Sequence, residues 1–297
     1  MTGIVTLRSG ALRLDLAPAI GGAISRFASE GPNGAIEWMR PMSAAALAAG
    51  EILGASCFPL VPYSNRIRDN SFTFDGHRVR MAHSFPHALH GHGWLAPWRV
   101  ESAAADRASL VFTRDATADW PFAYRARQDF VLADGCLVTR LDLVNTGDRR
   151  MPAGFGLHPY FPRTPRCRLH AGVTGLWETD AAILPTRLVA PDVPRDPRAG
   201  LAVDSVPLDT CFTGWDGRAE IVWPETGTAL AMTAEGPMGF FVVYTPTGEP
   251  YFCAEPVSNA TDAVNLVAAG RDDTGLLVLE PGETASARIV FAPRGPG

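Results

Sequence analysis

Alternation of apolar and polar residues with a period of two runs through most of the chain. It is clearest in residues 12–16 (LRLDL), 122–132 (FAYRARQDFVL) and 137–144 (LVTRLDLV). Successive side chains of an extended strand point to opposite faces, so the pattern predicts half-buried antiparallel strands. Similar runs continue from residue 218 to residues 285–291 (ASARIVF), which extends the prediction to the end of the chain.

Short turns and one short helix separate these predicted strands. Asp75-Gly76 and Asp134-Gly135 each lie between two alternating runs, and such pairs tolerate the positive φ angles of a tight hairpin turn. Residues 43–50 (SAAALAAG) predict a helix that begins after the N-cap Ser43 and ends at Gly50. Many strands without a long linker predict an all-β fold, one large antiparallel β-sandwich in a single domain over residues 1–297.

Composition narrows the functional classes. The net charge is -5 and no basic run exceeds a pair, so we expect no nucleic-acid partner. No segment has the long apolar run of a membrane span, and we expect no membrane partner. Five scattered cysteines without CxxC spacing predict neither a disulfide framework nor a zinc knot, which favours the cytoplasm.

The absence of lysine excludes several reaction classes. All 26 basic residues are arginine. Schiff-base aldolases and pyridoxal enzymes need a lysine amine, and a phosphate-binding P-loop needs its GK[ST] motif. The chain can therefore belong to none of them.

Four segments with polar residues break the alternation and are candidates for chemistry. They are residues 57–72 with Asn65 and Arg66, residues 87–94 with His87, His90 and His92 and with His83 upstream, residues 154–161 with His158, and residues 251–265 with Glu255. The simplest interpretation of each is a solvated loop. Glu255 differs because aromatic residues and a cysteine precede it, and a desolvated carboxylate has its pKa raised toward the working range of a general base.

Together, these segments resemble one protein family. The matching motifs are NRI (65–67), LHG (89–91), WPFAYRARQDFVL (120–132), MPAGFGLHPYF (151–161), LDTCF (208–212), EPVSNATDAVN (255–265) and LEPGE (279–283). Their order and spacing are similar to those of the aldose 1-epimerases, or galactose mutarotases. The resemblance implies a large antiparallel supersandwich with a sugar in a cleft on one sheet, and it agrees with the strands predicted above.

The resemblance also implies roles for individual residues. Glu255 matches the general base at the anomeric hydroxyl, and His158 matches the general acid at the ring oxygen. Arg66 and His90 match positions that orient the substrate, and Asp209 matches a carboxylate that binds sugar hydroxyls. Asn65, in the same NRI motif as Arg66, is a further candidate for sugar binding.

The chemistry of anomer interconversion explains why an acid and a base are needed. One oxygen of the sugar loses a proton while the ring oxygen gains one, the ring opens, and it recloses on the other face. No electrons move, so we expect no metal and no redox cofactor. The expected partner is a small sugar, while the identity of the aldose and the oligomeric state stay open.

Three alternatives remain at this stage. His90 and His92 could share one side of a strand and bind a metal together with His87. A hexose-6-phosphate mutarotase would need a further cation, for which Arg68 is the candidate. A non-catalytic carbohydrate-binding protein could share the fold. The resemblance assigns no role to His87 or His92.

Overall fold

Two large antiparallel sheets form most of the structure, a computed structural model that describes residues 3–32, 34–82 and 87–295. The larger sheet contains, in spatial order, β1 (Val5–Ser9), β2 (Leu12–Ala17), β3 (Ala23–Gly31), β5 (Cys57–Leu60), β15 (Gly156–Pro162), β24 (Tyr251–Val257), β23 (Phe240–Tyr244), β20 (Asp209–Thr213), β17 (Gly175–Thr179) and β18 (Pro185–Val189), with β4 (Gly34–Glu37) paired to β3.

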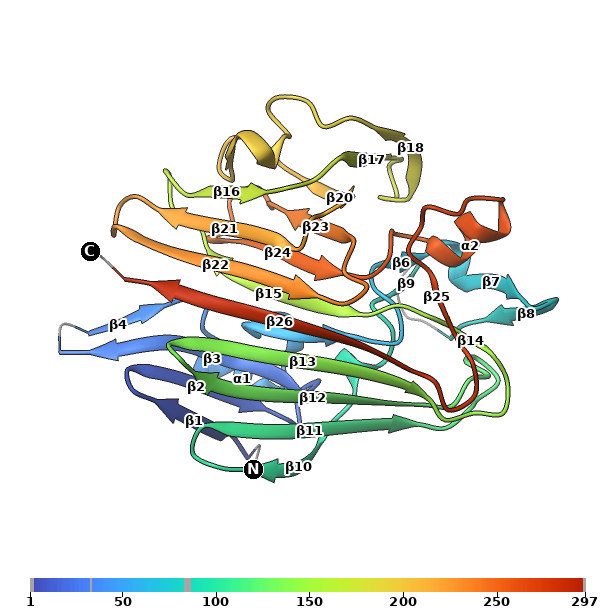
Figure 1. Ribbon diagram of the computed structural model, residues 1–297, viewed down its shortest axis with the longest axis horizontal. Coiled ribbons are helices and arrows are strands. Elements are labelled where there is room, and N and C mark those ends of the chain that lie inside the picture. Colours follow the sequence, from blue (N-terminus) through green and yellow to red (C-terminus); the bar gives the residue numbers. More distant parts are fainter. Residues whose placement is uncertain (1–2, 33, 83–86, 296–297) are drawn as a thin grey trace.

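The second sheet lies in front of the first in Figure 1. Its strands, in spatial order, are β10 (Arg99–Ala103), β11 (Arg107–Arg114), β12 (Tyr124–Ala133), β13 (Cys136–Asn145), β26 (Thr284–Arg294), β22 (Thr228–Glu235), β21 (Arg218–Trp223), β16 (Arg168–Ala171) and β19 (Leu201–Ala202). The two layers form a β-sandwich, as the sequence predicted.

Smaller elements lie mostly at one end of the sandwich (Figure 1). The strand pairs are β14 (Met151–Ala153) with β25 (Leu277–Leu279), β6 (Arg66–Ile67) with β9 (Ala88–Leu89), and β7 (Ser71–Phe74) with β8 (His77–Arg80). The helices are α1 (Ala44–Ala49) and α2 (Ala263–Ala268), with 3-10 turns η1 (Ile52–Gly54), η2 (Arg68–Asn70), η3 (Gly93–Leu95) and η4 (Pro197–Ala199). Each of these helices, within the described ranges, is too short or too polar to span a lipid bilayer.

The local predictions are confirmed where the sequence carried turn and capping signals. Asp75 and Asp134 have φ angles of 47° and 51°, and the glycine after each is also positive, as the predicted hairpin turns require. The side chain of Ser43 accepts a hydrogen bond from the Ala46 backbone N–H, and Gly50 ends α1 in the left-handed conformation. The sequence did not predict α2, whose N-cap Asp262 makes no side-chain capping bond.

The larger sheet is buried on both faces by two different hydrophobic clusters. On β23, Phe241 and Val243 belong to a cluster that includes residues of both sheets and fills the space between them. Phe240 and Val242, the alternating residues of the same strand, belong to a smaller cluster on the opposite face. Loops and short elements cover that outer face, and the predicted functional residues lie there.

Candidate active site

Strand register brings the predicted acid and base side by side. In the pairing of β15 with β24, Gly156 lies opposite Val257 and Tyr160 lies opposite Cys253. The positions midway between these pairs are His158 and Glu255, which therefore share the outer face of the sheet. Residues almost a hundred positions apart in the sequence become neighbours because their strands are adjacent.

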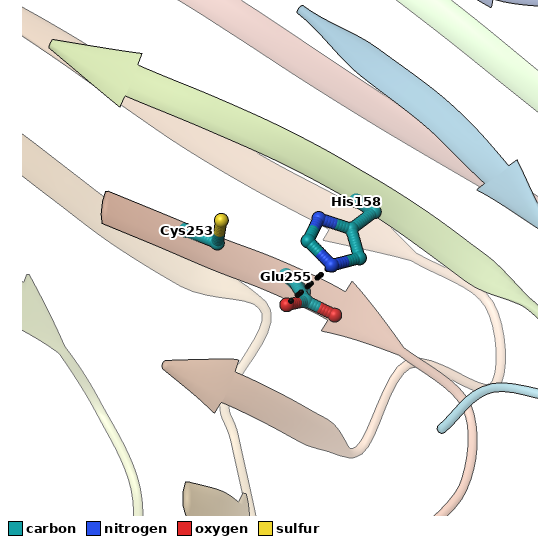
Figure 2. A group of neighbouring side chains, drawn as sticks. All are labelled: His158, Cys253 and Glu255. Carbon is teal, nitrogen blue, oxygen red and sulfur yellow. Dashed lines mark ion pairs between the residues drawn. The ribbon is translucent and has the colours of Figure 1, made fainter. Parts of the chain in front are cut away.

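The contact between the two side chains is direct. The Nε2 atom of His158 lies 3.3 Å from the Oε1 atom of Glu255 (Figure 2). Both residues are buried, with 7% of His158 and 2% of Glu255 exposed. Within the described residues, the Nδ1 atom of His158 and the Oε2 atom of Glu255 have no hydrogen-bond partner. Buried polar atoms usually have partners, so these two are available to a bound molecule.

Burial acts on the two groups in opposite directions. Desolvation lowers the pKa of His158 to about 3, and the charge of Arg40 acts in the same direction. Desolvation also raises the pKa of Glu255 well above its usual range, and the charge of Asp209 adds to this effect. Both shifts favour a pair with no net charge, in which one proton is available to the two side chains.

A cluster of aromatic rings packs around the His158 imidazole and holds it in place. The Trp94 and Phe58 rings stack at a centroid distance of 5.4 Å, and Phe58 lies 4.6 Å from His158. Tyr160 stacks on His158 at a centroid distance of 4.8 Å and an interplanar angle of 17°, and the Tyr160 centroid also lies 6.0 Å from that of Phe58. The guanidinium carbon of Arg40 lies 4.0 Å from the Tyr160 ring centroid, at the edge of this cluster.

Arg40 is itself fixed by backbone contacts. Its Nη2 group donates to the carbonyl oxygens of Leu53 and Ala55 at 2.6 and 2.7 Å. Sequence reasoning identified neither Arg40 nor the stacked rings. Tyr160 could have been found, because it lies two residues after His158 in a predicted motif and hence on the same strand face. Arg40 carries no motif that would have indicated it.

Two loop residues bond reciprocally at the wall of the site. The Asn65 backbone N–H donates to the Nδ1 atom of His90 at 3.1 Å, and the His90 backbone N–H donates to the Asn65 carbonyl oxygen at 2.9 Å. Both residues have positive φ angles, 60° and 59°. Because Nδ1 of His90 accepts a hydrogen bond, a neutral His90 ring carries its proton on Nε2.

Arg66 links this wall to the sheet. Its Nη1 group donates to the Oδ1 atom of Asn65 at 3.1 Å, and its Nη2 group donates to the Oδ2 atom of Asp209 at 3.2 Å. Asp209 lies on β20. Burial raises the pKa of Asp209, while the charge of Arg66 opposes that rise. The network fixes a guanidinium and a carboxylate at the edge of the acid-base pair.

All six predicted site residues line one cavity of about 240 Å³. Its walls are formed by Leu53, Phe58, Asn65, Arg66, Leu89, His90, Trp94, His158, Tyr160, Asp209, Val242, Tyr244, Tyr251 and Glu255. Binding sites for small molecules commonly enclose about 300–1,000 Å³, so this cavity suits a single small ring. An aromatic floor with a few convergent polar groups is typical of a small-molecule site.

Comparison with known proteins identifies the family. The sequence model of the aldose 1-epimerase family matches residues 3–292. The chain belongs to the aldose 1-epimerase family. This confirms the resemblance predicted from the sequence motifs.

Individual proteins that are similar to this chain support the same fold. The chain is 31% identical to the uncharacterized Escherichia coli K12 protein YphB, over 96% of this chain and 97% of that protein. A solved structure of a candidate aldose 1-epimerase from E. coli K12 has a TM-score of 0.87 at 29% identity and covers 99% of both chains. A galactose mutarotase-like protein from Clostridium acetobutylicum has a TM-score of 0.85 at 18% identity, covering 98% of this chain and 94% of that one. The predicted galactose mutarotase-like supersandwich is confirmed.

The remaining histidines do not follow the predicted metal arrangement. Strand β9 ends at Leu89, so His90 and His92 do not share one side of a strand. His92 contacts the Tyr124 hydroxyl at 3.2 Å, whereas the Nδ1 atom of His87 accepts from the Asp69 backbone N–H. The loop conformation directs the three rings to different surroundings. His83 lies outside the described residues.

Arg68, the predicted phosphate ligand, lies away from the cavity walls. Its guanidinium is 3.6 Å from carboxylate oxygens of both Asp180 and Asp262. The chain turns at η2 directly after β6, which separates Arg68 from Arg66 in space although they are close in sequence. Arg68 is therefore not placed to bind the phosphate of a hexose 6-phosphate in this cavity, as the hexose-6-phosphate mutarotase hypothesis required.

Proposed function

We propose that the protein is an aldose 1-epimerase that interconverts the α and β anomers of a free aldose. The observation that carries the proposal is the pairing of His158 with Glu255, 3.3 Å apart on neighbouring strands of a buried cavity. A purely sugar-binding protein has no use for an acid and a base in direct contact. The family assignment supports the same class of reaction.

The reaction needs one proton to arrive and one to leave. When the single proton of the pair lies on His158, the Glu255 carboxylate removes the proton from the anomeric hydroxyl while the His158 imidazolium donates its proton to the ring oxygen. The C1–O5 bond breaks and the free aldehyde forms. Rotation about the C1–C2 bond exposes the other face of the aldehyde, and the reverse proton transfers close the ring. The pair regains its starting protonation, and no redox step occurs.

The rest of the cavity orients the sugar. The Arg66 guanidinium donates and the Asp209 carboxylate accepts, so together they suit the vicinal hydroxyls of a sugar ring. His90 contributes a donor beside His158, since the two rings meet edge-on at a centroid distance of 5.2 Å. Asn65 binds Arg66 and His90 and fixes both. The aromatic residues offer apolar surface to the C–H faces of the ring.

A neutral monosaccharide fits this set of charges better than a phosphorylated one. The Arg66 charge already faces Asp209, and the Arg68 charge faces two carboxylates outside the cavity. A phosphate dianion is best bound by unpaired cations at bidentate geometry.

Exchange NMR between α and β anomers, measured over free and phosphorylated aldoses, tests the proposal. His158→Asn should lower turnover by roughly two to four orders of magnitude, the usual contribution of a general acid, with little change in sugar affinity. His87→Asn is the matched control, because His87 is a hydrogen-bonded histidine outside the cavity. Equal activity in both variants would remove His158 from the mechanism. Activity should also survive exhaustive chelation.

A further inference from the structure

Cys253 is a buried thiol beside the acid-base pair that the proposed mechanism does not use. It lies two residues before Glu255 on β24 and is fully buried on the same face (Figure 2). One ligand atom each of Cys253, Glu255 and His158 lies within 4.8 Å of the others. The strand period and the register with β15 bring the three together.

These three side chains offer the donor types that zinc prefers. Thiolate sulfur, imidazole nitrogen and carboxylate oxygen bind Zn²⁺ at about 2.3, 2.0–2.1 and 2.0–2.2 Å, in tetrahedral sites. Two such nitrogen and oxygen ligands are then separated by about 3.3–3.5 Å. The distance from Nε2 of His158 to Oε1 of Glu255 is 3.3 Å, so this edge of the tetrahedron is already formed.

Two further features favour an ion at this place. Within the described residues, the second carboxylate oxygen of Glu255 has no partner, so the carboxylate is free to turn toward a cation. A Zn²⁺ ion with one thiolate, one carboxylate and one neutral imidazole also carries no net charge. A buried cavity tolerates such a neutral complex better than an isolated ion.

We propose that Cys253, His158 and Glu255 form an inhibitory site for a thiophilic divalent cation, Zn²⁺ in particular. The inhibition rests on the proposed function, whereas the binding does not. The metal occupies the lone pairs of Nε2 and of the carboxylate, so neither group can transfer a proton to or from a sugar. The fourth coordination position faces the cavity and is filled by water.

Binding exchanges protons for the metal. The resting site holds one proton on the Cys253 thiol and one shared by the His158–Glu255 pair. Ligation requires thiolate, neutral imidazole and carboxylate, so two protons leave for each Zn²⁺ that enters. No bond to carbon and no electron transfer is involved, and chelation reverses the change.

Cobalt provides a spectroscopic test that is independent of activity. Titration of the reduced full-length protein with Co²⁺ should give one bound ion and a thiolate-to-cobalt charge-transfer band in the near ultraviolet. Cys253→Ala should abolish the band and weaken Zn²⁺ binding by at least about tenfold in calorimetry. Cys136→Ala is the matched control, because Cys136 is the one partly exposed thiol and should leave the band intact. Mg²⁺, which prefers oxygen ligands, should neither bind nor compete.

Absence of the band in the wild-type protein, or its persistence in a folded Cys253→Ala variant, would overturn the site. Cys253→Ser supplies a second variant of nearly equal volume if the alanine variant does not fold. Zn²⁺ should stop anomer exchange reversibly, and an excess of substrate sugar should displace the Co²⁺ band. A protein that shows the band but catalyses no anomer exchange contradicts the proposed function and leaves the metal site standing.

Discussion

The two faces of the larger sheet are both buried, yet they differ in chemistry. On β24, Phe252 and Ala254 point into the space between the sheets and are packed on all sides by apolar groups. Cys253 and Glu255 alternate with them and point to the outer face, where polar atoms lie beside aromatic rings. One strand of seven residues therefore serves stability through one set of side chains and chemistry through the other.

This difference explains why the inner face needs only volume and apolarity, whereas the outer face needs particular atoms. An inner side chain contributes by filling space, and its neighbours tolerate similar shapes. An outer side chain such as Glu255 is costly to bury and has an oxygen without a partner within the described residues. Substitutions on the two faces should consequently separate stability from turnover.

Glu255→Gln should produce the largest change, in turnover alone. The amide keeps the size of the side chain but lacks the basic oxygen, so the rate of anomer exchange should fall by roughly two to four orders of magnitude. The free energy of unfolding should stay within about 1 kcal/mol of wild type, because the glutamine amide can still form a hydrogen bond with the His158 imidazole. Exchange NMR and urea unfolding measure the two quantities. An unchanged rate would contradict the role of Glu255 as base.

Phe252→Ala, three residues before Glu255 on the same strand, should lower the stability of the protein and leave its turnover unchanged. Phe252 is fully buried against Phe161 at a ring centroid distance of 5.7 Å, and truncation of such a side chain costs about 3–5 kcal/mol of folding free energy. The rate per folded molecule should remain close to wild type, as determined by activity assays corrected for the folded fraction from urea unfolding. Phe252→Leu, which leaves a smaller cavity, is the control that stays folded. A selective loss of turnover in the leucine variant would break the comparison between the faces.

Sequence reasoning predicted the elements better than it predicted the details of the site. Period-two alternation and the Asp-Gly turns are local signals, and the structure confirms the strands and hairpins built from them. The six site residues were chosen through family motifs, and the cavity brings all six together, while their roles stay predictions. The proximity of Cys253 to His158 could not be predicted, because it depends on the register of two strands far apart in sequence.

The pH profile of turnover should distinguish a buried pair from two independent groups. Activity requires one proton on the His158–Glu255 pair. A second proton blocks the base and gives a cationic pair, while loss of the proton removes the acid and gives an anionic pair. Burial disfavours both charged states, so it lowers the pKa of His158 to about 3 and raises the pKa of Glu255.

The resulting profile should be a broad plateau across neutral pH, with its acid limb well below the ordinary histidine pKa of about 6.5. Exchange rates measured from about pH 4 to pH 9, corrected for uncatalysed mutarotation, provide the check. If both groups were exposed, the pH profile would instead be bell-shaped, with its two limbs near the ordinary pKa values of about 4.3 for glutamate and 6.5 for histidine. Such a bell-shaped profile would show that water solvates the His158–Glu255 pair. It would contradict the interpretation that both faces of the larger sheet are buried.

Arg40→Met should have the smallest effect, since Arg40 acts on the acid only through Tyr160 and through its charge. Burial is the main cause of the lowered His158 pKa, and the Arg40 charge adds to it. Removing that charge makes the doubly protonated pair less unfavourable, so the acid limb of the profile should move to higher pH. Turnover on the plateau should fall by less than about tenfold, because methionine still covers the Tyr160 ring.

Arg187→Met is the control for Arg40, because Arg187 is an exposed arginine on β18 whose partner is Glu178. Its profile should match that of the wild type. A shift of the acid limb to lower pH in Arg40→Met would contradict the electrostatic contribution of Arg40. A plateau lowered at every pH without any shift would mean that Arg40 acts by holding the aromatic cluster around His158 in place. Arg40→Lys would then fail to restore the rate, because ammonium lacks the planar group that covers Tyr160.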